Sequence, residues 1–207
     1  MRLIYGFIAL LFLINTSTAQ TGAGADYQLT IDGVEQNLTL GKEAIIELKS
    51  GIKVPAILKK REFGNFITNY LSFDFPGQYT VASSPVDDTI TQHIVVTALG
   101  TMMLVQDYED NLPSGMLEIM YDVMVKEPKA LGLDIEKSEL TRKIANQDVL
   151  TGLQARYKDG DEDVIIDIIA TPSGQGGFLI VTMHDKLMLP DESGIIERFW
   201  ESVTLKK

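Results

Sequence analysis

The sequence contains no cysteine, and this absence excludes several kinds of stabilisation and chemistry. Disulfide bridges, thiol nucleophiles and zinc sites built on thiolates all require cysteine. A lipid anchor attached through cysteine is excluded for the same reason. The chain must therefore be stabilised by a buried core. Its 207 residues, 45% of them hydrophobic, are enough to form one domain with a small appendage.

Basic residues are few relative to acidic ones, with 18 Lys and Arg against 29 Asp and Glu, and the net charge is −11. A field of this sign repels DNA, RNA and anionic membrane surfaces. We therefore expect no nucleic-acid partner. The short basic run at residues 59–61 is expected to be the solvated end of a strand.

The sequence also lacks an apolar run of eighteen residues, and its main apolar run lies near the N-terminus, at residues 3–14. Arg2 precedes this run and small polar residues follow it, which is the layout of a secretory signal peptide. Twelve helical residues rise about 18 Å, well short of the ~30 Å hydrocarbon core of a bilayer. We expect a signal peptide at residues 1–19, a periplasmic or secreted mature protein, and no stable membrane anchor.

Removal of that signal peptide takes away one basic residue, Arg2, and no acidic one, so the net charge of the mature chain is −12. Residues 20–65 are expected to form a leader and a β-rich appendage, because short extended segments alternate there with turn pairs such as Asp32-Gly33 and Ser50-Gly51. Residues 66–207 are expected to form the main domain.

Alternating and helical periodicities divide the main domain into strands and two helices. Strands are predicted at residues 71–76, 89–98, 102–108, 153–157, 164–171 and 178–184. A helix is predicted to begin at Ser114 and to end at Pro128 and Gly132, and a second one to bury Phe199 and Trp200. The first carries an apolar stripe formed by Met116, Ile119, Met120, Val123 and Met124. The predicted fold is α+β, with a central antiparallel sheet flanked by helices in an α/β/α sandwich.

Residues 66–205 resemble the PsbP/DcrB-like family. The resemblance rests on the motif LSFDFP at residues 71–76, on the aromatic Tyr79 that follows it, and on the order of hairpin, amphipathic helix, strand pair and final helix with Phe199-Trp200. Tyr79 stands where that family often has tryptophan. The resemblance implies a central antiparallel sheet flanked by helices, and an exported accessory or binding role without catalysis.

Two histidines, His93 and His184, are the candidate general bases. Neither has a carboxylate on the same face of its own predicted strand, because neighbours such as His184 and Asp185 point to opposite faces. No G-x-S-x-G motif accompanies either histidine. We therefore predict that neither of them supports a reaction.

Carboxylates cluster at the end of one predicted strand, at Asp107, Glu109 and Asp110, followed by Asn111. Asp107 and Glu109 share a face at about 6.6 Å of rise, which is a spacing that a glycosidase pair could use. The favoured interpretation is a solvated loop before a helix, whose dipole attracts negative charge.

A second acidic run, Asp159, Asp161 and Asp163, has the spacing with which a calcium loop begins. The EF-hand pattern fails, because Val164 and Ala170 occupy the positions of the required glycine and glutamate. A weak calcium site formed by the acidic loops stays open.

The composition, the resemblance and the missing catalytic motifs together predict a non-enzymatic exported binding or accessory module of unknown ligand. Its partner is expected to be a protein or a small ligand in the periplasm or envelope. No catalytic, cofactor-binding or metal-binding residue is assigned. Two alternatives stay open: a carboxylate- or metal-dependent hydrolase, and a calcium-stabilised structural protein. An enzyme would require Asp107 or Glu109 to share a pocket with His93 or His184.

Overall fold

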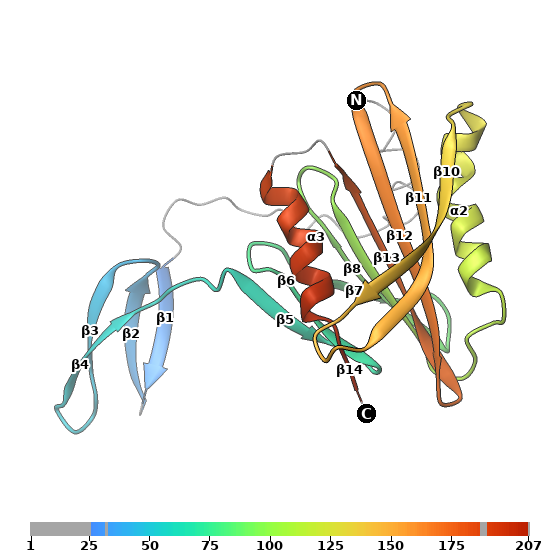
Figure 1. The fold of residues 1–207 in the computed structure, drawn as a ribbon. Coiled ribbons are helices and arrows are strands. Elements are labelled where there is room, and N and C mark those ends of the chain that lie inside the picture. The colour runs from blue at the N-terminus through green and yellow to red at the C-terminus, as the bar shows by residue number, and fades with distance from the viewer. Residues whose placement is uncertain (1–25, 32, 187–189, 207) are drawn as a thin grey trace. The chain divides into compact units, whose positions relative to one another are not determined.

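The structure is a computed structural model that describes residues 26–31, 33–186 and 190–206 (Figure 1). The expected signal peptide, residues 1–19, and the leader up to residue 25 lie outside the described residues. Among the described residues, 26–62 belong to one compact unit and 63–206 to another. Within the part of the chain that is described, no helix is long and apolar enough to cross a membrane.

The smaller unit consists of two antiparallel hairpins. In the first, β1 (Asp26–Ile31) pairs with β2 (Val34–Thr39), and in the second, β3 (Glu43–Glu47) pairs with β4 (Lys53–Ile57). Gly33 and Gly51 have φ angles of 77° and 80°, the left-handed conformation that glycine adopts without a steric cost in a tight turn. Leu38 and Ile46 are buried in this unit.

The larger unit is built on a seven-stranded antiparallel sheet with the strand order β10-β11-β12-β13-β9-β8-β7. The strands are β7 (Ala82–Pro85), β8 (Ile90–Val96), β9 (Met102–Tyr108), β10 (Ile135–Lys143), β11 (Val149–Asp159), β12 (Glu162–Ser173) and β13 (Gly176–Asp185). A separate three-stranded antiparallel sheet has the order β14-β6-β5, with β5 (Phe63–Ile67), β6 (Leu71–Pro76) and β14 (Thr204–Leu205).

Two helices, α2 (Met116–Ala130) and α3 (Pro190–Ser202), lie on opposite sides of the seven-stranded sheet (Figure 1). Helix α3 and the three-stranded sheet cover one face, and α2 packs on β10, β11 and β12 from the other side. Each face therefore has its own apolar core. Phe199 and Trp200 are both buried in the core beneath α3, which confirms the prediction for the last helix.

The predicted α/β/α sandwich is wrong, because the fold is mostly β. Strands make up 54% of the described residues and helices 14%, and only two helices occur among those residues. The physical reason is that successive antiparallel strands are joined by short hairpins, which need no helical crossover. One face of the large sheet is consequently covered by three further strands as well as by α3, so that sheet packs on sheet there.

The ends of α2 also differ from the prediction. The residue before its first turn is Gly115, with φ 88°, and no side chain caps the helix, whereas Ser114 was the predicted cap. The helix continues through Pro128 and ends at Ala130, and Gly132 follows with φ 77°. Pro128 lies in the last turn of the helix and is buried. Because proline has no backbone N–H, it cannot donate to the carbonyl four residues earlier, and the helix ends two residues later.

Candidate functional site

A row of polar side chains crosses β7, β8 and β9 on the face that the three-stranded sheet covers. Ser83 pairs directly with His93, and His93 pairs with Val105. Asp107 lies two residues beyond Val105, so it is on the same face and diagonal to His93. Diagonal neighbours of this kind are within reach of long side chains. The sheet therefore brings Ser83, His93 and Asp107 together from three strands.

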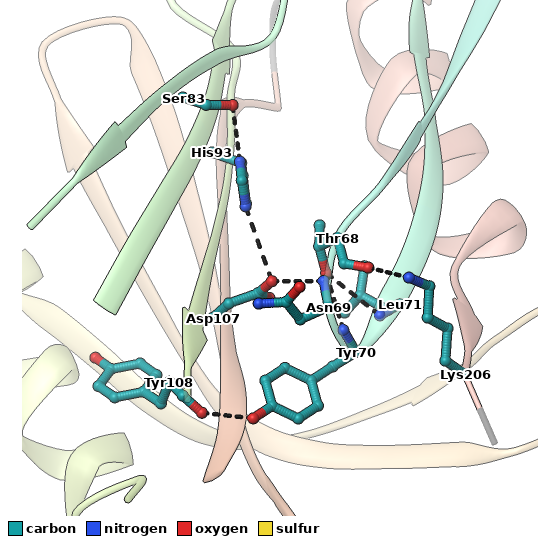
Figure 2. A network of polar contacts seen from close by, with 9 residues as sticks. All are labelled: Thr68, Asn69, Tyr70, Leu71, Ser83, His93, Asp107, Tyr108 and Lys206. Carbon is teal, nitrogen blue, oxygen red and sulfur yellow. Dashed lines mark hydrogen bonds and ion pairs between the residues drawn. The ribbon is translucent and has the colours of Figure 1, made fainter. Parts of the chain in front are cut away.

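The three side chains contact one another in sequence (Figure 2). The Ser83 Oγ atom lies 2.8 Å from Nδ1 of His93, and Nε2 of His93 lies 3.8 Å from Oδ2 of Asp107. Asp107 is almost fully buried, and its Oδ2 atom also accepts the backbone N–H of Asn69 at 2.7 Å. The ring of Phe66 packs 5.0 Å from the His93 ring, centroid to centroid. The histidine is thus held between an aromatic ring and a buried carboxylate.

The turn between β5 and β6 is fixed to β9 by further contacts (Figure 2). The Tyr70 hydroxyl donates to the backbone oxygen of Tyr108 at 2.7 Å, and Lys206 Nζ donates to the backbone oxygen of Thr68. The Thr68 hydroxyl accepts the backbone N–H groups of Tyr70 and Leu71. These bonds hold Asn69 in place as the donor to Asp107, so the position of that carboxylate is well determined.

The prediction that His93 has no carboxylate partner considered only its own strand, whereas Asp107 comes from the neighbouring strand β9 and was named only as a residue that an enzyme would bring into a pocket with a histidine. The position of Asp107 next to His93 could have been predicted from the sequence, because the hairpin from β8 to β9 was predicted. Its closing bond, from the Thr97 N–H to the Thr101 oxygen, sets the register that places His93 opposite Val105. Glu109 and Asp110 are exposed beyond the end of β9, as expected for a solvated loop, whereas Asp107 is buried within the strand, which corrects that expectation.

A second polar cluster lies on the same face of the sheet, across β10 to β13. Gln154, Asp167 and Thr182 form one cross-strand row. Asp167 is 0% exposed. Its Oδ1 atom accepts from Nε2 of Gln154 at 2.8 Å, and its Oδ2 atom accepts from Nε of Arg142 at 3.0 Å and from Nη2 of Arg142. The Asp167 carboxylate is therefore paired with the positive charge of Arg142 and hydrogen-bonded at both oxygens inside the fold.

His184 belongs to this second cluster, because it lies two residues from Thr182 on the same face. Burial lowers its pKa below the ordinary value, and the nearby charge of Asp167 partly opposes that shift. Nδ1 of His184, Oγ1 of Thr182 and Nε1 of Trp200 are all buried without a hydrogen-bond partner in the described structure. Asp185, the next residue in β13, accepts the backbone N–H of Asp163 at its Oδ1 atom, at 2.9 Å.

The acidic run of the calcium hypothesis does not form a loop of ligands. Asp163 lies in β12 and binds Arg156 through both oxygens, at 2.7 and 2.6 Å. The hydrogen bond from Arg156 lowers the pKa of Asp163 below its usual value. Asp161 lies in the exposed turn between β11 and β12. Among the described residues, no three His, Cys, Asp or Glu side chains are grouped so that they could hold a metal ion.

Comparison with known proteins gives no assignment: no family model matches the chain, and no curated protein matches it. The resemblance to the PsbP/DcrB-like family stays a prediction from the sequence.

Proposed function

We propose that the mature chain is an exported binding or accessory module, and that its partner is a protein that docks on the outer face of helix α2. The supporting observation is that α2 is apolar on two sides, only one of which packs on the sheet. Eight of the ten residues from 116 to 125 are apolar, and the other two are Glu118 and Asp122.

The side of α2 that packs on the sheet is formed by Tyr121, Val125 and Pro128, which are buried. Part of the predicted core stripe faces solvent and not the sheet, because the side chains of Ile119 and Val123 are 52% and 41% exposed. The periodicity of the sequence could not distinguish the two apolar sides, since both have helical spacing. A surface helix normally carries polar residues on the side away from the core, so this exposure requires an explanation.

We name the exposed pair Ile119 and Val123 the outer stripe. Met116 and Met120 are half-buried and pack against the core beneath α2, so they do not belong to it. Neighbouring exposed apolar residues on a helix are typical of an interaction site. The net charge of −12 favours a partner whose apolar docking surface is bordered by basic residues, because complementary charge accelerates encounter and fixes orientation.

The buried carboxylates give less support to a carboxylate-based hydrolase. Asp107, Asp163 and Asp167 are each less than a tenth exposed. His93 and Asn69 contact the first, and arginine side chains bind the other two. Each carboxylate therefore has a partner that holds the layers or strands together.

The outer stripe can be tested by charge substitution at both of its positions. The double variant Ile119→Glu/Val123→Glu is compared with wild type and with Val149→Glu, a matched control at a residue that is 58% exposed on β11. All three mature proteins are immobilised and used to capture partners from the native envelope fraction. We expect one protein to bind wild type and the control, and its recovery to fall at least about tenfold with the double variant, which is the effect of about 1.4 kcal/mol of lost binding.

Folding of the variants is checked by urea unfolding. Both substituted positions are exposed, so the midpoint should stay close to that of wild type. Capture of the same proteins in equal amount by all three chains would contradict the proposal.

A further inference from the structure

Ser83, His93 and Asp107 are arranged in the order of a nucleophile, a base and a group that orients the base. An ionised carboxylate only accepts hydrogen bonds, so the ring N–H of neutral His93 belongs on Nε2, which faces Asp107. The lone pair is then on Nδ1, and the Ser83 hydroxyl donates to it across 2.8 Å. The 3.8 Å between Nε2 and Oδ2 is longer than a hydrogen bond, so Asp107 acts on the ring through its charge.

The three residues differ in their access to solvent in the way that this chemistry requires. His93 and Asp107 are buried, whereas Ser83 is exposed. Ser83 lies on β7, the edge strand of the seven-stranded sheet among the described strands. A reagent can therefore reach the hydroxyl from solvent, while the base behind it is shielded by the ring of Phe66.

The backbone of β7 adds a second donor beside the hydroxyl. The Val86 N–H donates to the Ile90 oxygen at 2.8 Å, so these two residues form a hydrogen-bonded pair. Along an antiparallel ladder, hydrogen-bonded pairs alternate with non-hydrogen-bonded pairs. The next hydrogen-bonded pair is therefore Ser84 with Gln92, and Ser83 with His93 is a non-hydrogen-bonded pair. The N–H of Ser83 consequently points away from β8, towards the open edge of the sheet. A backbone N–H in that position is a suitable donor to a developing oxyanion.

We propose that Ser83 is an activated nucleophile for acyl transfer from small carboxylic esters, with His93 as the base and Asp107 as a positioning residue. Oγ of Ser83 bonds to the ester carbonyl carbon, Nδ1 of His93 takes the hydroxyl proton, and the alcohol leaves with that proton as the ester bond breaks. Water then attacks the acyl group, again with Nδ1 as base, and Ser83 recovers its proton. This inference goes beyond the proposed function and departs from the expectation that neither histidine supports a reaction.

The test uses the mature protein and a fluorophosphonate probe, which bonds through phosphorus to an activated serine oxygen and releases fluoride. Intact mass and peptide mapping locate the adduct. We expect one adduct, on Ser83. Ser84→Ala is the matched control, because Ser84 is the next residue, is also exposed and points to the opposite face. It should label at the wild-type rate, whereas Ser83→Ala and His93→Gln should each reduce the rate at least about 100-fold.

Two further variants separate this proposal from a structural role and from the docking proposal. Asp107→Asn should lower the labelling rate and change its pH profile in a protein that still unfolds cooperatively. Ile119→Glu/Val123→Glu should label as wild type does. No adduct on wild type, an adduct on another residue, or equal labelling of Ser83→Ala would overturn the proposal. If His93→Gln does not fold, the comparison of Ser83→Ala with Ser84→Ala still decides it, since both serines are exposed.

Discussion

Replacement of Arg142 by leucine is expected to destabilise the protein by about 3 to 5 kcal/mol, the usual cost of leaving a buried charge without its partner. Asp167 is 0% exposed and would lose the donors Nε and Nη2 of Arg142, keeping only Gln154. Arg142 itself is 32% exposed, so water can approach one side of the pair. We therefore expect a value near the lower end of that range, about 3 kcal/mol.

The assay is urea unfolding at pH 7, followed by far-UV circular dichroism and by the fluorescence of the single tryptophan, Trp200. Because the Arg142 guanidinium lies 5.7 Å from the Trp200 ring, the dichroism measurement serves as the independent probe. Arg198→Leu is the control, since the Arg198 side chain is 49% exposed and its ion pair with Asp74 should be worth less than about 1 kcal/mol.

The double variant Arg142→Leu/Asp167→Leu removes the buried charge together with its partner. Leucine is larger than aspartate and adds volume at a fully buried position, so the double variant should recover part of the loss and be more stable than Arg142→Leu alone. A loss below about 1 kcal/mol for Arg142→Leu alone, without recovery in the double variant, would refute the conclusion that this ion pair is buried and coupled.

Three further predictions concern the core, the pH dependence and the N-terminus. Trp200→Ala should cost about 3 to 5 kcal/mol in chemical denaturation through lost burial and a cavity, and a loss under about 1 kcal/mol would mean that α3 does not dock. Because the folded protein holds the His184 pKa below the ordinary 6.5, the unfolded chain takes up that proton first, and the free energy of unfolding should fall as the pH drops below 6.5. His184→Gln should weaken this dependence, and an unchanged dependence would contradict the assignment. Intact mass of the exported protein should show a start at or within a few residues of Gln20, and retention of Met1 would contradict the signal peptide.

Both helices and several strands of the larger unit were predictable because their signals are local, whereas β5, β7, β10 and β14 were not predicted. Alternation identified β6 and the hairpin from β8 to β9, and helical spacing identified α2 and the burial of Phe199 and Trp200. The fold class was not predictable in the same way. β10 carries charged residues along most of its length and buries only Leu140, so its sequence lacks the alternation of a strand.

The polar clusters were predictable only where the register of a hairpin was predictable. The pairing of His93 with Val105 follows from the turn between β8 and β9, and Asp107 could have been placed from it. Ser83 could not, because the four residues of β7 show no strand pattern. The contact of Arg142 with Asp167 depends on the order of three strands, which local periodicity does not contain.

Photo-crosslinking in the native envelope can show whether the outer stripe of α2 binds a protein. A photoreactive residue is placed at position 119, and the same residue at position 149 serves as the control, because both positions are exposed. The account predicts one discrete crosslinked product from position 119 and none of that mass from position 149. An absence of product from position 119, or the same products from both positions, would contradict it.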